Sequence, residues 1–552
     1  SVMIAIMVAM FFSAINQTIV GTAMPRIIAE LGGMDHYTWV ITIYLLTSTI
    51  ATVLVGKLSD IYGRKPFILT GIAVFIIGAF MCGLSRDIFE MIAYRGIQGV
   101  GAGIIMASAF TAVGDLFSPR ERGRWMGLMM AVFGFSSVLG PALGGWMVDH
   151  LDWKWLFWVF LPLGIVAFYM ILVQFPRGKR RPAEKIDYAG SLFLALFLVA
   201  LLLGFSLAGT EYAWDSAQII GLFAAAAVFL AVFVWIESRA ASPVMPLSLF
   251  RNDIVTISNV IGFLMNAGMM GALIYLPLFV QGVEGISPTY SGYVTMPMSI
   301  SMVVVSAVIG RQITRTGKYK RYALAGMPIM IAGMLIMAFM DTVWQSVLAM
   351  IVFGFGLGMG MPVFSVTVQN AVSPADLGVA TASGQMFRNL GGTIGIAVLG
   401  TIMNSEMRRH MKLSLPSSGT EGAVGGLPAG VDPQTAQQLK ELLSTEALLD
   451  QPRLEQLRQS LPDNVQPIID QMLGIVRDAL SASLTTVFLT GTALVAVAAA
   501  LAFFLREIPL RTSNRMPGDG GGHAGGERVG DGKKGAGGES VVGRLGEPDP
   551  AR

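Results

Sequence analysis

A short charged turn separates two long apolar segments near the start of the chain. It reads Gly56-Lys57-Leu58-Ser59-Asp60-Ile61-Tyr62-Gly63-Arg64-Lys65-Pro66. Glycine permits a tight turn at each side, whereas bases and acids are costly to place in the hydrocarbon of a bilayer. The pattern therefore predicts two membrane-spanning helices that are joined by a turn outside the membrane.

The composition agrees with a membrane protein. The chain has 552 residues, of which 54% are hydrophobic and only 13% are charged, against about 25% charged residues in a soluble domain. Much of its surface must therefore face a lipid bilayer. The formal charge of +3, the single cysteine and the four scattered histidines indicate no nucleic-acid partner, no disulfide framework and no metal site.

Apolar runs of about 20 residues are long enough to cross a bilayer as helices, and fourteen are present. They lie at Met3–Met24, Trp39–Val55, Phe67–Leu84, Phe89–Val113, Trp125–Val148, Trp155–Phe175, Ile186–Leu207, Ala217–Ile236, Ile254–Val280, Ser291–Gly310, Tyr322–Phe339, Val343–Thr367, Gly378–Met403 and Leu484–Leu505. Lys and Arg gather in alternate loops, whereas the opposite short loops carry only Arg26, Arg86 and Lys154. Because cytoplasmic loops are the basic ones, we expect both termini in the cytoplasm.

An internal repeat appears at an offset near 255 residues. Gly56 and Gly63 match Gly310 and Gly317, and Ser118-Pro119 matches Ser373-Pro374. The first six and the last six spans are therefore related as two parallel halves, and spans seven and eight are an inserted pair.

The predicted organisation has six parts. They are an N-terminal six-helix half (1–176), two inserted helices (177–240), helices nine to thirteen of the C-terminal half (241–403), an extracytoplasmic helical hairpin (404–483), the last transmembrane helix (484–511) and a disordered cytoplasmic tail (512–552). Asp432-Pro433 is a typical helix start within the hairpin, and the glycine-rich tail has few apolar residues. Because the chain opens directly in an apolar run, we expect a short segment before Ser1.

Several ordered motifs carry a resemblance to a known family. Besides the opening turn, they are Gln17–Pro25 in span one, Arg95–Gly103 in span four, Gly134 with Gly140–Gly145 in span five, and Phe387–Gly392 in span thirteen. Over nearly its whole length the chain resembles the fourteen-span drug:proton antiporters of the major facilitator superfamily.

The resemblance implies an all-α membrane protein with the major facilitator fold. It implies a monomer in the plasma membrane that is not an enzyme and confers antibiotic resistance by multidrug efflux. Hydrophobic or cationic compounds would leave by alternating access, with protons as the coupling ion and no other cofactor. Two rivals stay open, namely a dedicated lipid or metabolite exporter of the same fold and a non-transporting membrane sensor.

The resemblance also implies a cytoplasmic gate in the opening turn. Its residues would be Gly56, Asp60, Gly63, Arg64 and Lys65, with ion pairs and helix dipoles closing that side. Ordinary solvated loop charges are the alternative. Arg388 in span thirteen is assigned to the gate, with a membrane anchor as its alternative.

Span five carries a candidate helix-packing hinge of Gly134, Gly140, Pro141, Gly144 and Gly145. Gly140 and Gly144 are four residues apart, so they share a face that admits close helix approach. Pro141 removes a backbone donor and bends the helix. The alternatives are a hinge against the other half and a packing face alone.

The resemblance implies proton coupling at Arg95 and at the position of Asn16. Arg95 lies several residues inside a span, where a charge normally faces a wet cavity or a partner. The resembling family usually has aspartate at position 16, and no Asp or Glu before the external loop lies deep inside a predicted span. Either the chain is an Asp→Asn variant that mimics the protonated acid, or it couples differently.

The substrate cavity is predicted between spans one, two, four, nine and thirteen. Its candidate lining residues are Asn16, Tyr44, Gln98, Asn266, Met269 and Gln385. The chain has 34 methionines, whose flexible side chains adapt to varied apolar shapes. A methionine that merely faces lipid or another helix is the alternative at each position.

Overall fold

The computed structural model describes residues 2–31, 37–176, 187–209, 212–286, 288–373, 376–414 and 466–509. Within these ranges the regular structure is helical, apart from one isolated bridge between Ala208 and Tyr212. The predicted tail, most of the predicted external hairpin and the 177–186 connection lie outside the described residues.

The first half and the inserted pair comprise nine helices within the described ranges. They are α1 (Val2–Leu31), α2 (Tyr37–Tyr62), α3 (Arg64–Cys82), α4 (Ile88–Leu116), α5 (Pro119–His150), α6 (Trp155–Trp158) with α7 (Leu161–Gln174), α8 (Tyr188–Leu207) and α9 (Ala217–Glu237). The helices α6 and α7 together form the predicted sixth span.

The second half follows a short 3₁₀ helix, η2 (Leu247–Arg251). Its helices are α10 (Asp253–Leu278), which continues as the π-helical segment η3 (Phe279–Val283), then α11 (Pro288–Thr316), α12 (Lys320–Ala338), α13 (Val343–Ala371), α14 (Leu377–Ser414) and α18 (Gln466–Phe504). The last two run beyond the predicted span limits of 403 and 484, because a helix does not have to end where its apolar run ends.

Local sequence signals account for several helix starts. The carboxylate of Asp87 accepts a hydrogen bond from the backbone N–H of Glu90 and caps α4. At α5 the N–H of Ser118 donates to the Glu121 carboxylate, 3.3 Å away. At α13 the N–H of Thr342 donates in the same way to the side-chain oxygen of Gln345. These side chains satisfy backbone groups that the first helical turn leaves unpaired.

Thirteen of the described helical segments are long and apolar enough to cross a membrane. The one predicted span missing from this set is the fifth, Trp125–Val148, which corresponds to α5; that helix is 32 residues long but carries many glycines and a charged first turn. This is a multi-pass membrane protein, and its spans follow the predicted order.

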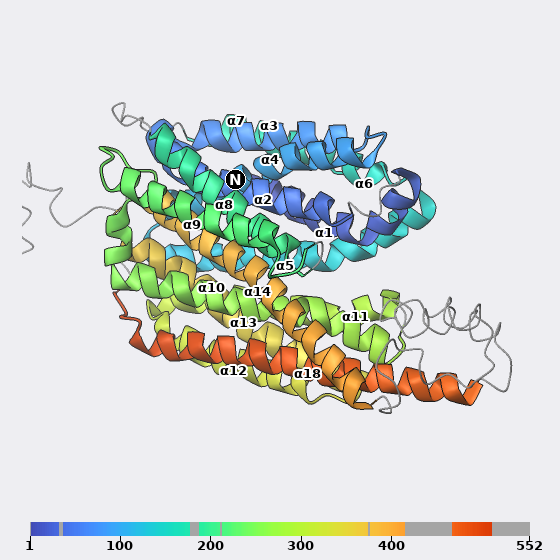
Figure 1. Cartoon of the computed structure of the whole chain (residues 1–552). Coiled ribbons are helices and arrows are strands. Elements are labelled where there is room, and N and C mark those ends of the chain that lie inside the picture. The colour runs from blue at the N-terminus through green and yellow to red at the C-terminus, as the bar shows by residue number, and fades with distance from the viewer. Residues whose placement is uncertain are drawn as a thin grey trace, which may run out of the picture. The chain divides into compact units, whose positions relative to one another are not determined.

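The two halves pack as separate bundles that meet along a few helices (Figure 1). In the first half α1 packs on α5 and α7, and α4 packs on α2 and α3. In the second half α10 packs on α14 and α18, and α13 packs on α11 and α12. The halves meet mainly where α5 contacts α11 and where α2 contacts α14, while α8 of the inserted pair lies against α2 and α14.

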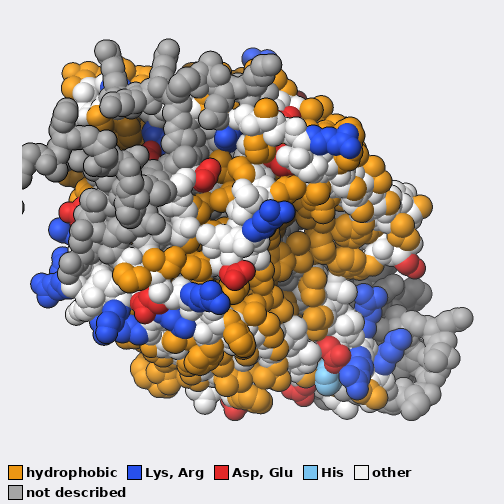
Figure 2. All heavy atoms as spheres, turned by 90° about the vertical axis from the view of Figure 1, so that its left-hand side faces the viewer, with side chains coloured by type: hydrophobic (Ala, Val, Ile, Leu, Met, Phe, Trp, Pro, Cys, Tyr) orange, Lys and Arg blue, Asp and Glu red, His pale blue; other side chains and the backbone are white. Residues whose placement is uncertain are grey.

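One end of this bundle holds the α2–α3, α4–α5 and α11–α12 turns and the C-terminal end of α18. We call it the basic end, and Figure 2 shows its Lys and Arg side chains in blue. The opposite end holds the α3–α4, α5–α6 and α12–α13 turns. The repeat is visible in the turns themselves, because Gly63 and Gly317 both have positive φ angles, 91° and 68°, which favour glycine.

Candidate functional site

A cavity of ≈ 930 Å³ lies between the two halves. The helices α1, α2, α4 and α5 line it from the first half, and α10, α11, α13 and α14 line it from the second. Its volume falls in the range of about 300–1,000 Å³ that is usual for small-molecule sites. The cavity is therefore large enough for a drug-sized molecule.

The cavity reaches the opposite end of the bundle. Trp146 and His150 at the end of α5 and Tyr293 near the start of α11 line it there, and all three side chains are exposed. From this mouth the lining runs inward to Phe110, Ser365 and other residues in the interior of the helices. Access is thus from the opposite end, which requires a seal at the basic end.

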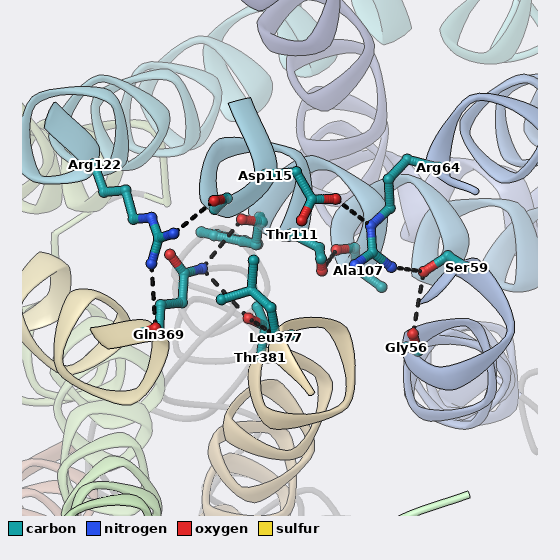
Figure 3. A network of polar contacts seen from close by, with 12 residues as sticks. Gly56, Ser59, Arg64, Ala107, Thr111, Asp115, Arg122, Gln369, Leu377 and Thr381 are labelled. Atoms are coloured by element: carbon teal, nitrogen blue, oxygen red, sulfur yellow. Dashed lines mark hydrogen bonds and ion pairs between the residues drawn. The ribbon is translucent and has the colours of Figure 1, made fainter. Parts of the chain in front are cut away.

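Arg122 forms the centre of that seal (Figure 3). Its side chain is 5% exposed, and its guanidinium donates to the backbone oxygens of Gly114 and Gln369, at 2.6 and 3.2 Å. The side-chain amide of Gln369 donates in turn to the backbone oxygen of Phe110 and to Thr381, at 3.2 and 3.3 Å. These bonds tie α4 and α5 of one half to α13 and α14 of the other.

A second part of the network lies within the first half. The Nε of Arg64 donates to the carboxylate of Asp115 at 2.7 Å, and its NH1 donates to the hydroxyl of Ser59 at 2.5 Å. Figure 3 shows this pair beside the Arg122 cluster. The predicted gate residue Arg64 therefore holds α2, α3 and α4 together at the basic end.

The other predicted gate residues lie in different places. Gly56 is in direct contact with α14, because a Cβ at this position would lie 2.5 Å from the Cβ of Ala382. Gly63 forms the turn, and Lys65 donates to the backbone oxygen of Phe175 at 2.9 Å. The side chain of Asp60 lies outside the described part of the chain. Arg388 does not join this network and instead lines the cavity.

The glycines of α5 contact two different partners. A Cβ on Gly140 would lie 2.1 Å from the hydroxyl of Thr18, so this glycine packs against α1 of its own half. Gly134 lies against the side chains of Met302 and Val303 of α11. Gly144 is buried, whereas the surroundings of Pro141 and Gly145 lie outside the described part of the structure.

A close contact between the halves lies nearer the start of α5, at glycines outside the predicted hinge. A Cβ on Gly127 would lie 2.4 Å from the backbone oxygen of Ser306, and one on Gly310 would lie 2.5 Å from that of Gly123. In the internal repeat, Gly123 of the first half is equivalent to Gly378 of the second half, and Gly56 is equivalent to Gly310. Gly56 and Gly378 also meet, on the pseudo-symmetric side of the molecule.

The predicted proton-coupling residues form a buried polar cluster in the first half. Asn16, Arg95 and Gln98 are each at most 1% exposed. The amide of Gln98 donates to the Oδ1 of Asn16 at 2.9 Å, and Arg95 donates to the Oε1 of Gln98 at 2.7 Å. The guanidinium of Arg95 also lies 4.1 Å from the ring centre of Tyr44. Among the residues that the structure describes, the Nδ2 of Asn16 has no hydrogen-bond partner.

This cluster lies beside the cavity rather than on its wall. Of the six predicted lining residues, Asn266, Met269 and Gln385 line the cavity, whereas Asn16, Tyr44 and Gln98 are buried between helices. The neighbouring Gln17 lines the wall instead. Consecutive residues of a helix point about 100° apart, which explains why Gln17 faces the cavity while its neighbour Asn16 does not.

A further anchor closes the basic end of the second half. The backbone N–H of Ile508, after α18, donates to the hydroxyl of Tyr319 at 2.9 Å, and the carboxylate of Glu507 accepts from the N–H of Tyr319 at 2.9 Å. Burial raises the pKa of the Tyr319 phenol above its ordinary value, which favours the neutral form that takes part in this contact.

Comparisons with known proteins agree with this geometry. Residues 6–396 match the Major Facilitator Superfamily. The chain is 38% identical to the multidrug transporter protein MdtP of Bacillus subtilis over 93% of this chain and 94% of MdtP. It is 32% identical to multidrug resistance protein 3 of the same organism, over 93% and 96% of the two chains.

Among solved structures, the human organic anion transporter MFSD10 superposes with a TM-score of 0.58. The match covers 90% of this chain and 98% of that one at 14% sequence identity, and it therefore supports the fold alone. Together with the family match and the two Bacillus relatives, the fourteen-span, two-half architecture confirms the expected fold. The chain belongs to the Major Facilitator Superfamily.

Proposed function

We propose that the protein is a multidrug exporter that moves hydrophobic small molecules out of the cytoplasm by alternating access. The observation that carries the proposal is a drug-sized cavity between two repeat halves, reached from one end and sealed at the other. Transporters of this architecture work by rocking one half against the other around a central site. The names of the two Bacillus relatives favour drugs as substrates.

The basic end faces the cytoplasm in this proposal. Lys and Arg are concentrated in its turns, as expected for cytoplasmic loops. The cavity then opens to the outside, so the structure corresponds to the state that releases substrate. The glycine contacts of Gly127 with Ser306 and of Gly56 with Ala382 allow the halves to approach closely at the cytoplasmic side in this state.

Protons are the proposed coupling ion, and the Asn16 cluster is the proposed coupling site. An acid at position 16 would lie within hydrogen-bond distance of Gln98 and near Arg95. Asparagine has the shape of a protonated aspartic acid but cannot release a proton. We therefore propose that Asn16 holds the site in the equivalent of its protonated form.

Transport in proteoliposomes tests the proposal. Loss of a neutral fluorescent hydrophobic compound from preloaded vesicles down its gradient would support a transport function. Protein-free vesicles give the background leak. Equal loss from vesicles with and without the protein, across a panel of neutral hydrophobic compounds, would contradict it and favour the sensor.

A further inference from the structure

The charges on the cavity wall are unevenly distributed. Arg388 of α14 is the one residue with a permanent charge among the described residues that line the cavity, and His150 lies at the mouth. No Asp or Glu is present among those lining residues. A molecule in the cavity therefore meets a positive charge without an acidic side chain to balance it.

The contacts of Arg388 are neutral. Its NH2 donates to the side-chain oxygen of Gln385 at 2.5 Å, and its NH1 lies 3.4 Å from the hydroxyl of Ser365. No carboxylate within the described ranges forms an ion pair with it. Its aliphatic stem packs beside Gly262 of α10, and the side chain is partly exposed where it lines the cavity.

An unpaired guanidinium inside a membrane protein is unfavourable. Polar neutral partners offset only part of the free energy that the charge loses on leaving water, and an opposite charge offsets more. A carboxylate suits arginine best, because two parallel hydrogen bonds can form between the planar groups. The free hydrogen-bonding capacity of Arg388 is thus matched to a ligand acid group.

The rest of the wall is suited to an apolar body. Nine methionines line the cavity: Met10, Met106, Met130, Met269, Met270, Met296, Met298, Met302 and Met361. Their flexible, polarizable side chains adapt to different apolar shapes. The small polar residues Ser137 and Thr393 interrupt this apolar surface but supply no negative charge.

We infer that the cavity preferentially binds amphipathic organic anions, with the acid group on Arg388 and the apolar body among the methionines. The inference rests on the proposed export function and specifies its substrate class. It differs from the cationic class that the family resemblance implies, because a cation in this cavity would find no acidic partner among the described lining residues.

Three ligands with one apolar body test the inference. They are 1-pyrenebutyric acid, its primary amide and 1-pyrenebutylamine, which are anionic, neutral and cationic at pH 7. Binding to the full chain in nanodiscs of zwitterionic lipid is measured by fluorescence, with empty nanodiscs subtracted. We expect the acid to bind at least about tenfold more tightly than the amine, as charged hydrogen bonds allow.

Two variants assign the preference to its residue. Arg388→Gln should weaken binding of the acid about tenfold or more while leaving binding of the neutral amide within about twofold. Arg388→Lys should retain part of the preference for the acid, because the charge remains but the forked geometry is lost. Arg408→Gln, at an exposed arginine on the same helix, should change nothing.

The outcomes separate this inference from the proposed function. Equal affinity for the acid and the amine, absence of binding by the acid, or a preference that survives Arg388→Gln would overturn the inference. If the neutral amide is still transported in that case, the export function stands. If the acid binds through Arg388 but no compound moves across the membrane, the anion site stands and the export function fails.

Discussion

Lys65 and Lys320 make the same contact in the two halves of the molecule. The Nζ of Lys65 donates to the backbone oxygen of Phe175 after α7, and that of Lys320 donates to Phe503 in the last turn of α18, each at 2.9 Å. Carbonyls at a helix C-terminus lack partners and carry partial negative charge. Each half thus uses a lysine to hold the end of its sixth helix.

Replacing Lys320 tests this clamp. Lys320→Gln should loosen the last turn of α18 by about 0.3–1 kcal/mol, the usual strength of such a charge at a helix end. Amide hydrogen exchange in the last turn of α18 should accelerate about twofold to fivefold. Lys318→Gln removes an exposed charge from the same turn and should leave exchange unchanged. Equal exchange in the two variants would contradict the clamp.

The Arg122 seal predicts a shift between transport states. Arg122→Gln removes buried, charge-assisted hydrogen bonds to Gly114 and Gln369, each worth about 1.5–3 kcal/mol. The population open at the basic end should therefore rise at least about tenfold. Spin labels on the α4–α5 and α11–α12 turns report the change as a longer distance between the halves.

A neighbouring residue supplies the control for that experiment. Arg124 is exposed and lies two positions away on the same helix, so Arg124→Gln removes the same charge without breaking the seal. Its distance distribution should match that of the unmodified chain. A similar shift in both variants would mean that surface charge, and not the Arg122 bonds, holds the basic end closed.

The contact of α5 with α11 predicts a steric effect. In Gly127→Ala the new methyl group would lie 2.4 Å from the backbone oxygen of Ser306, and a packed helix backbone cannot easily move away. We expect a destabilised sealed state and at least about a tenfold loss of transport rate, at normal membrane insertion. Gly221→Ala in α9, where a Cβ would meet no atom of the described residues within 4 Å, should transport normally.

The span pattern and the repeat could be predicted because a bilayer imposes length and hydropathy on each helix. The side-chain contacts between the two halves could not be predicted from the sequence. Arg122 looks like one of several loop bases in sequence, and only the packing of α5 on α13 brings it to Gln369. For the same reason Arg388, predicted at the gate, lines the cavity instead, and Asn16 lies behind the wall that Gln17 reaches.

The last prediction concerns coupling at Asn16, whose Oδ1 accepts a hydrogen bond from Gln98 while its Nδ2 has no partner within the described ranges. With Asn16 the chain should move substrate down a gradient but fail to concentrate it, whereas Asn16→Asp should pump uphill. One charge that crosses 100 mV supplies about 2.3 kcal/mol, or roughly a 45-fold gradient of a neutral substrate per proton. Uptake into inside-out vesicles with an imposed potential and pH gradient measures this ratio.

A carboxylate at the adjacent position separates the buried cluster from the cavity wall. Gln17→Glu places an acid on the wall, away from the Gln98 and Arg95 bonds, and should not confer uphill transport. If the unmodified chain concentrates substrate as well as Asn16→Asp does, with the same pH dependence, position 16 does not carry the proton. If Gln17→Glu pumps equally well, any acid near the cavity suffices, and the hydrogen bonds of the cluster have no special role in coupling.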